Sequence, residues 1–180
     1  MGSVRAEITP VTIDPRYHDA VLFDLDGVVT DTAAVHEAAW QELFDDYLSR
    51  RPAAPNEDHG PFTSGDYRHF IDGKPRYDGA RDFLASRGVA LPRGSDSDDP
   101  AVETLCGLGN RKQVLFLERL TDGVPVFEST VALIRQLHNA GVRVAVISAS
   151  RNCALVLESA DLTKLFDVRV DGVVLSLIHI

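Results

Sequence analysis

The sequence predicts an α/β fold in which a parallel sheet is interrupted by an inserted helical domain. Two apolar runs, at 20–24 and 142–148, have the composition of buried parallel strands. The long segment between them has mostly helical patterns, whereas a crossover between parallel strands needs only about a dozen residues. We therefore divide the chain into a core, residues 1–36 and 126–180, and an inserted helical domain, residues 37–125.

The individual elements follow from local patterns. The first run, AVLFD, ends in acidic residues and glycine, as in a strand that delivers side chains to a site at its carboxyl end. Thr32 is the expected N-cap of a helix at 33–50, whose apolar residues recur at helical spacing. The other predicted elements are helices at 66–71, 78–87, 101–106, 110–121, 128–140 and 151–160, and strands at 142–148 and 166–170.

Composition excludes several classes of partner. Apolar residues make up 44% of the chain, charged residues 25%, and the net charge is −9. Nucleic acids and anionic membranes select basic surfaces, so neither is expected as the main partner. The first ten residues contain no apolar signal-peptide core. Cys106 and Cys153 are expected to be reduced core residues of a cytoplasmic protein. Nothing in the sequence indicates an oligomeric state.

An acidic pair follows the first strand. Asp24 and Asp26 stand at i and i+2, so in an extended chain both carboxylates face the same side. Two carboxylates so close repel each other unless a cation relieves them, and Mg²⁺ prefers such oxygen ligands. One carboxylate could then attack phosphorus while the other handles a proton. The alternative is a solvated strand end with an Asp-Gly turn, but the position directly after a buried strand favours the site.

A second candidate site follows the second strand, in the segment SASRN at 148–152. There a strand ends and a helix is expected to begin, so hydroxyl groups, free backbone N–H groups and a helix N-terminus converge, a combination that binds oxyanions. Arg151 adds a charged donor. The alternative is a capped helix start with a surface arginine. The predicted anion-binding residues are Ser148, Ala149, Ser150, Arg151 and Asn152.

The string FDLDGVVTD resembles the first motif of the haloacid dehalogenase superfamily, and its continuation TDTAAVHEAAW is similar to the β-phosphoglucomutase branch. The resemblance extends over about residues 18–174 and implies a Rossmann-like core with a helical cap. It implies that Asp24 is the phosphorylated nucleophile and Asp26 the general acid/base, whose main-chain carbonyl also binds Mg²⁺. In the same family the serine that ends the second strand, here Ser148, holds the transferring phosphoryl group.

The resemblance also assigns roles in the rest of the site. SASRN resembles the branch's site for a second substrate phosphate, which implies that role for Ser150, Arg151 and Asn152. His36 falls where the branch keeps a histidine at the hinge between core and cap, although a lone histidine on a helix surface is the alternative. The segment GNRKQ, at 109–113, resembles a cap segment whose lysine contacts the sugar phosphate. This implies Lys112, with Arg111 beside it, whereas the cap arginine of the family could be Arg68 or Arg76.

These implications lead to three functional hypotheses. The first is Mg²⁺-dependent phosphoryl transfer on a small phosphorylated sugar through an aspartyl-phosphate, as in β-phosphoglucomutase. The second is a phosphatase on the same substrates, similar to trehalose-phosphate phosphatase. The third is a fragment that only binds phosphate esters.

The third hypothesis rests on the end of the chain. The family needs a further lysine in a Gly-Lys-Pro segment and an acidic pair that completes the Mg²⁺ site, and neither follows Val174, where the sequence reads LSLIHI. Lys164, in a helix turn, is a poor substitute. We therefore expect a C-terminally truncated chain with an incomplete core, and an open edge of the strand at 20–24 that is prone to association.

Overall fold

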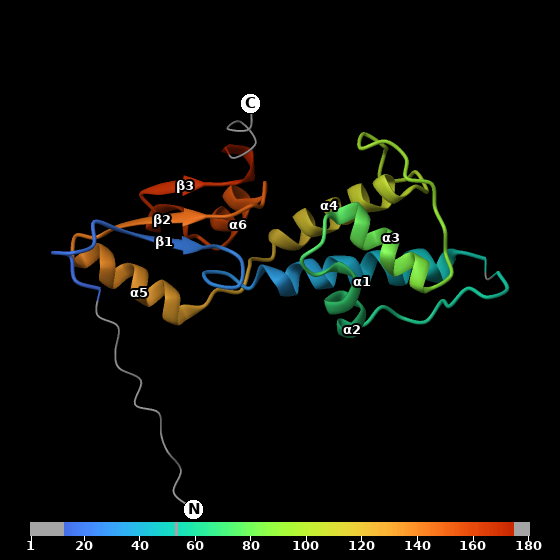
Figure 1. The fold of residues 1–180 in the computed structure, drawn as a ribbon, viewed down its shortest axis with the longest axis horizontal. Helices are drawn as coiled ribbons and strands as arrows, with labels where there is room; N and C mark the ends of the chain where they lie inside the picture. The colour runs from blue at the N-terminus through green and yellow to red at the C-terminus, as the bar shows by residue number, and fades with distance from the viewer. Residues whose placement is uncertain (1–12, 53, 175–180) are drawn as a thin grey trace, which may run out of the picture.

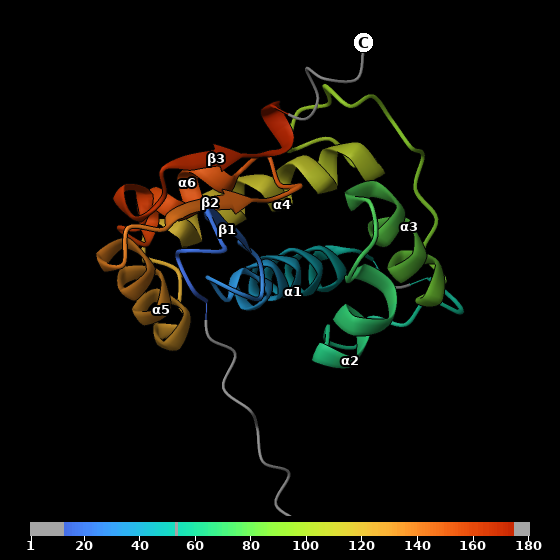
Figure 2. The same ribbon diagram turned by 60° about the vertical axis from the view of Figure 1, so that its left-hand side comes forward.

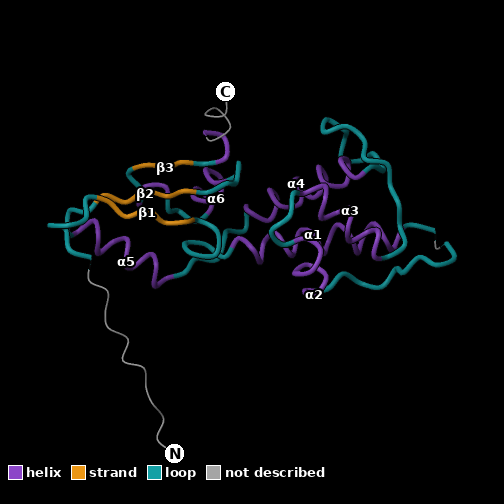
Figure 3. The backbone as a smooth tube through the Cα atoms, viewed as in Figure 1, coloured by secondary structure: helices purple, strands orange, loops and turns teal. Residues whose placement is uncertain are grey.

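The protein, described by a computed structural model over residues 13–52 and 54–174, has a sheet lobe and a helical lobe arranged along its long axis (Figure 1). Its elements, drawn by type in Figure 3, are β1 (Ala20–Asp24), α1 (Thr32–Arg50), α2 (Ser64–Asp66), the π-helical turn η1 (Tyr67–Ile71), α3 (Arg76–Ser86), α4 (Leu105–Leu120), α5 (Glu128–Asn139), β2 (Arg143–Ile147), α6 (Cys153–Ser159), the 3₁₀ turn η2 (Thr163–Leu165) and β3 (Val168–Val170).

The sheet is parallel, with strand order β1-β2-β3. Ala20 pairs with Arg143 and Asp24 with Ile147, so the two strands predicted from the sequence are direct neighbours. Phe23 and Val146, on one face, are buried in an apolar cluster with residues of α5 and α6. The α/β prediction, with helices between parallel strands, is therefore confirmed.

The opposite face of the sheet carries exposed apolar side chains. Leu22 is 62% exposed, Val168 53% and Ile147 39%. The register and the two-residue period of a strand put these three side chains on the same face. Within the described residues β1 is also an edge strand, as expected from the sequence. Whether this open edge and face promote association stays a prediction.

Two apolar clusters organise the two lobes. One contains the sheet with α5 and α6, and the other contains the aromatic core of the helical lobe. Helix α1 contributes Ala39 to the first cluster and Trp40 to the second. Helix α4 likewise contributes Phe116 to the first cluster and Leu108 to the second. Continuous helices therefore pass from one lobe to the other. The domain boundaries at residues 37 and 125 stay a prediction.

The start of α1 differs from the prediction. Asp31, not Thr32, is the N-cap, because the Asp31 carboxylate accepts a hydrogen bond of 3.4 Å from the Ala34 N–H. Thr32 is the first helical residue and is buried, and its hydroxyl donates to the Asp26 carboxylate. The threonine therefore connects the helix to the acidic motif.

Helix α4 corrects the prediction of two helices at 101–106 and 110–121. It is one helix, and the Thr104 hydroxyl caps it by accepting from the Gly107 N–H at 2.9 Å. A Cβ atom at Gly107 would lie 2.1 Å from the Val102 carbonyl oxygen, and one at Gly109 would lie 2.7 Å from the Tyr77 ring. These glycines therefore permit close packing rather than ending the helix.

The remaining predicted elements are present with shifted ends. The helix predicted at 66–71 is divided between α2 and η1, and the one predicted at 151–160 begins at Cys153. Cys106 and Cys153 are both free and buried, as expected. No helix among the residues that the structure describes is long and apolar enough to cross a membrane.

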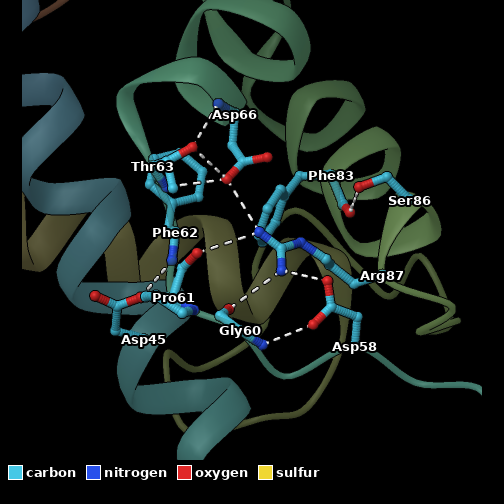
Figure 4. Close-up of polar contacts among 10 residues, drawn as sticks. All are labelled: Asp45, Asp58, Gly60, Pro61, Phe62, Thr63, Asp66, Phe83, Ser86 and Arg87. Carbon is cyan, nitrogen blue, oxygen red and sulfur yellow. Dashed lines mark hydrogen bonds and ion pairs between the residues drawn. The ribbon is translucent and has the colours of Figure 1, made fainter.

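Arg87, at the C-cap of α3, holds the loop that precedes α2 (Figure 4). Its guanidinium donates to Asp58 at 2.6 Å and to Asp66 at 3.0 Å, and also to two backbone carbonyls, of Gly60 and Pro61. The same group lies 5.2 Å from the centroid of the Phe83 ring. One half-enclosed cation thus satisfies acceptors on a loop that has few backbone hydrogen bonds of its own.

We expect Arg87→Ala to lower the free energy of unfolding by about 2 kcal/mol, because several charge-assisted hydrogen bonds are lost together. Urea denaturation would measure the change. Arg81→Ala on the same helix is the matched control, since Arg81 pairs with Asp78 and Asp82 at the surface, where such pairs contribute at most about 1 kcal/mol. Equal losses in both variants would contradict the role of Arg87.

Candidate functional site

The carboxyl ends of β1 and β2 bring the two sequence motifs together. The Leu25 N–H donates to the Ile147 carbonyl at 3.1 Å, which extends the pairing of the strands by one residue. Immediately beyond, the Ser148 hydroxyl donates to Oδ2 of Asp26 at 2.9 Å, while Thr32 donates to Oδ1. Ser148 is buried. Both oxygens of the Asp26 carboxylate are thus oriented by hydroxyl groups from different elements.

Asp24, the last residue of β1, is exposed. Within the described residues its carboxylate makes no hydrogen bond or ion pair, so it is available as a nucleophile or as a metal ligand. The described part of the chain has no group of three or more His, Cys, Asp or Glu side chains that could hold a metal ion.

Residues 148–152 form a compact turn, which we call the phosphate loop. The Ser148 hydroxyl accepts from the Ser150 N–H at 3.0 Å, and the Ser150 hydroxyl accepts from the Asn152 N–H at 3.1 Å. The prediction of free N–H groups here is therefore wrong for these two residues. The Ser148 hydroxyl has a double role, because it accepts from the loop and donates to Asp26. Arg151 is exposed.

The phosphate loop lies directly against Gly172, which follows β3. The Gly172 N–H donates to the Ser150 carbonyl at 3.2 Å. A Cβ atom at this glycine would lie 2.3 Å from the Ala149 carbonyl oxygen and 3.1 Å from the Arg151 nitrogen. Backbone atoms cannot move aside as a flexible side chain could, so any larger residue would displace the loop.

We expect Gly172→Ala to weaken the binding of inorganic phosphate about tenfold, a change of about 1.4 kcal/mol, because the loop must shift. Isothermal calorimetry would measure it. Gly65→Ala is the control, since a Cβ atom there meets only the Thr63 hydroxyl oxygen at 3.4 Å. If Gly172→Ala binds as tightly as the control, the loop is not held by this contact.

A cavity of about 770 Å³, which we call the cleft, opens beside the phosphate loop. It is lined by residues 149–152 of the sheet lobe and, from the helical lobe, by His36, Gln113 and residues 73–76. A smaller inner cavity of about 250 Å³ shares His36 and residues 73–76 with it. Asp24 and Asp26 line neither cavity, but the loop that lines the cleft begins at Ser148, which binds Asp26. Figure 2 shows the phosphate-loop side of the sheet facing α1 and α4.

Lys112 and His36 meet in the inner cavity. Lys112 is only 3% exposed, and its Nζ donates to Nδ1 of His36. The same ammonium lies 4.7 Å from the ring centroid of Phe116 and 5.6 Å from that of Trp40. Among the described residues it has no carboxylate partner, so aromatic faces and a neutral imidazole are its only stabilising neighbours. Such a site favours an added anion.

Burial shifts both pKa values. Desolvation, and then the positive charges of Lys112 and Arg76, lower the pKa of His36 to about 3, so this imidazole is neutral and can accept from Lys112. Desolvation, and then Arg76, lower the pKa of Lys112 to about 7. The pKa of Lys112 is lower in the folded chain than in the unfolded chain, so between about pH 7 and pH 10.5 the unfolded chain binds more protons. The free-energy cost of burying Lys112 therefore falls as the pH rises across this range.

We expect the affinity of the inner cavity for sulfate to fall as the pH rises through about 7, where Lys112 loses its proton. Sulfate keeps its charge in this range, and the His36 imidazole with its pKa of about 3 is neutral throughout. Calorimetry between about pH 6 and pH 8.5 would measure the dependence. Lys112→Met should abolish it, and a dependence that survives in this variant would assign it to another group.

The structure brings only part of the predicted set together. His36 and Lys112 share the inner cavity with Arg76, whereas Arg68 does not line either cavity. Arg111 points elsewhere: its Nε donates to the Pro100 carbonyl at 2.9 Å, and it lines a separate cavity with Tyr47 and Arg51. Successive residues of a helix do not share a face, which explains why Lys112 and its neighbour diverge.

Gln113 and Trp40 add to the site that the sequence predicted. Gln113 lines the cleft and was not predicted, and its only signal in the sequence is its position directly after Lys112. Trp40 packs on Phe44, with ring centroids 5.1 Å apart. It also lines the inner cavity.

Comparisons with known proteins bear on the family and the fold of the chain. A model of the haloacid dehalogenase-like hydrolase family matches residues 18–177. A protein of Mycobacterium tuberculosis named as an uncharacterized glycosyl hydrolase is 48% identical over 165 residues, which are 92% of this chain and 12% of that protein. A β-phosphoglucomutase of Mycobacterium bovis is 45% identical over 168 residues, which are 92% of this chain and 64% of that enzyme.

Solved structures show the same fold. The crystal structure of β-phosphoglucomutase from Clostridium difficile superposes with a TM-score of 0.60 at 19% identity, over 86% of this chain and 62% of that one. The chain therefore spans a minor part of the mycobacterial glycosyl hydrolase and somewhat less than two thirds of the β-phosphoglucomutases that it matches.

Proposed function

The chain belongs to the haloacid dehalogenase-like hydrolase family, and on this premise we propose that it transfers the phosphoryl group of a small sugar phosphate through an aspartyl-phosphate on Asp24. One observation carries the proposal. The Ser148 hydroxyl joins the Asp26 carboxylate to a loop that lines a cleft between the lobes. A candidate acid/base group and an oxyanion-binding turn thus meet at the end of two adjacent strands, and the turn also lines the cleft.

The chemistry divides between the two carboxylates. An oxygen of Asp24 forms a bond to phosphorus as the bond from phosphorus to the sugar oxygen breaks, and Asp26 gives the leaving oxygen its proton. Each Asp26 oxygen already accepts one hydroxyl hydrogen bond. A carboxylate oxygen has two lone-pair sites, so one remains on each to carry the transferred proton. In the second step Asp26 removes a proton from the acceptor hydroxyl, which takes the phosphoryl group from Asp24.

The described residues provide part of a site for a magnesium ion as the cofactor. The free Asp24 carboxylate and the Asp26 carbonyl would hold it, and substrate oxygens and waters commonly fill the other positions of Mg²⁺. When bound, the ion would neutralise charge on the phosphoryl oxygens.

The helical lobe would bind the rest of the substrate. Arg76 and Lys112 give positive charge to the connected cavities, and Lys74 lines both of them as well. Closing such a space excludes water, which favours transfer to a sugar hydroxyl over hydrolysis. The substrate class, a small sugar phosphate, is supported by the similarity to the mycobacterial β-phosphoglucomutases. The free thiols are compatible with a cytoplasmic location, which we also propose.

The proposal is tested by incubating the chain and Mg²⁺ with a hexose phosphate whose phosphoryl group is labelled. Label in an isomeric hexose phosphate would support the mutase reaction. Label in free phosphate would show that the reaction is phosphate ester hydrolysis on the same substrates and not the mutase reaction. Binding of the ester without any turnover would leave a phosphate-ester binding module, and absence of both binding and turnover would overturn the proposed function entirely.

A further inference from the structure

Three side chains form a bridge across the cleft. Nη2 of Arg76, at the start of α3, donates to Oε1 of Gln113 at 2.7 Å. Nε2 of Gln113, on α4, donates in turn to Oδ1 of Asn152 at 3.1 Å. Arg76 and Gln113 belong to the helical lobe, whereas Asn152 ends the phosphate loop. All three side chains line the same cavity of about 770 Å³.

The chemistry of the partners fixes the orientation of the Gln113 amide. A guanidinium can only donate, so the oxygen of the amide must face Arg76. The NH₂ group of Gln113 must then face the sheet lobe, where it requires an acceptor, and this places the oxygen of the Asn152 amide on its side. Each contact therefore determines the next, and reversing any one amide would put two donors or two acceptors together.

This orientation leaves donors pointing away from the bridge. Nη1 and Nε of Arg76 and the NH₂ group of Asn152 have no acceptor among the described residues. The two Arg76 groups belong to the helical lobe and the Asn152 group to the sheet lobe, and both residues line the cleft. An anionic group in the cleft can accept from both at once, provided that the bridge keeps them in place.

From this geometry we infer that Gln113 is a positioning residue: it fixes Arg76 and Asn152 on opposite walls of the cleft and so couples cap closure to an ordered phosphate loop. The inference rests on the proposed function, since it takes the anion to be a phosphate ester. Gln113 itself accepts and donates only within the protein. A leucine would fill the same space but could not orient either neighbour.

Two variants separate orientation from packing. Gln113→Leu removes both hydrogen bonds at similar volume. Gln113→Glu keeps the acceptor for Arg76 but cannot donate to Asn152, whose amide must then turn its oxygen toward the cleft. Gln136→Leu is the control, because Gln136 is exposed on α5 and lines neither cavity. If Gln113 only packs, Gln113→Leu should weaken phosphate binding more than Gln113→Glu. If Gln113 orients its neighbours, Gln113→Glu should weaken phosphate binding more.

The first measurement is the affinity for inorganic phosphate by calorimetry. We expect Gln113→Leu to bind phosphate about tenfold more weakly than the parent chain, since phosphate loses about one hydrogen bond from the neighbours that Gln113 no longer orients. Gln113→Glu should bind more weakly still, and Gln136→Leu should be unchanged. Parent-like affinity in Gln113→Leu, or an affinity of Gln113→Glu at or above that of Gln113→Leu, would overturn the inference.

The second measurement needs no ligand. Hydrogen exchange of the Ser150 and Asn152 amides, which bond to serine hydroxyls within the loop, should become faster in Gln113→Leu while exchange in the α1 and α5 helices is unchanged. If the parent chain binds no phosphate, the proposed function fails, and exchange still decides whether Gln113 orders the loop. Unchanged loop exchange together with normal phosphate binding would sink the role of Gln113 and leave the proposed function standing.

Discussion

Asp24→Asn is expected to lower phosphoryl transfer at least about a thousandfold, because an amide cannot form the aspartyl-phosphate. The carboxylate has no partner among the described residues, so its loss breaks no hydrogen bond of the fold, and the urea midpoint should hardly change. Turnover of a hexose phosphate in the presence of Mg²⁺ would measure the loss. Intact-protein mass spectrometry would show a phosphoryl adduct in the parent chain and none in the variant.

Asp122→Asn is the matched control for this experiment. Asp122 lies exposed in the turn after α4, so the same loss of charge there should leave transfer unchanged. If Asp24→Asn keeps its activity, or if the adduct persists in it, the nucleophile has been assigned to the wrong residue.

Ser148→Ala is expected to lower the turnover number about a hundredfold, the scale of losing one aligned donor in an active site. Its hydroxyl is the only side-chain group that contacts both Asp26 and the phosphate loop in the described structure. Its removal frees one oxygen of Asp26 and the Ser150 N–H together. Steady-state kinetics should show the effect mainly in turnover, with a smaller change in the Michaelis constant.

Ser148→Thr provides the rescue, since it restores a hydroxyl group at the same position, and it should recover most of the turnover. Ser49→Ala, which removes an exposed hydroxyl bonded to a backbone carbonyl of α1, should have no effect. A loss in Ser148→Ala that threonine does not rescue would indicate that the packing of this buried site matters, rather than the hydroxyl.

Local patterns predicted the parts of this structure that depend on neighbouring residues. The strands at 20–24 and 142–148 are short apolar runs bounded by polar residues, and their length favours a buried strand over a helix. Because both strands are parallel and adjacent, their carboxyl ends had to meet, which placed Asp26 beside Ser148. The acidic and serine-rich motifs were therefore found from the sequence, although their catalytic roles stay predictions.

Local sequence patterns did not predict the features that depend on contacts between distant segments. The single helix α4 was predicted as two, and its Gly107 and Gly109 each accommodate a neighbour that local sequence cannot reveal. Arg111 was grouped with Lys112, but the two side chains leave α4 on different sides. Arg111 therefore contacts Pro100, whereas Lys112 contacts His36. Gln113 could not be predicted because both of its partners lie more than thirty residues away, Arg76 at a separation of 37 and Asn152 at 39.

The pairing of β1 with β2 also determines the order in which the chain can fold. The whole helical insert lies between the two strands, so closing that loop early would cost entropy that no other contact offsets. Packing α1 against α4 first brings the ends of the insert together and shortens the loop that remains. During synthesis β1 leaves the ribosome long before β2, so its backbone stays unpaired and its apolar side chains stay exposed until β2 is made. We therefore expect the helices to assemble before the sheet, with sheet closure as the slow step.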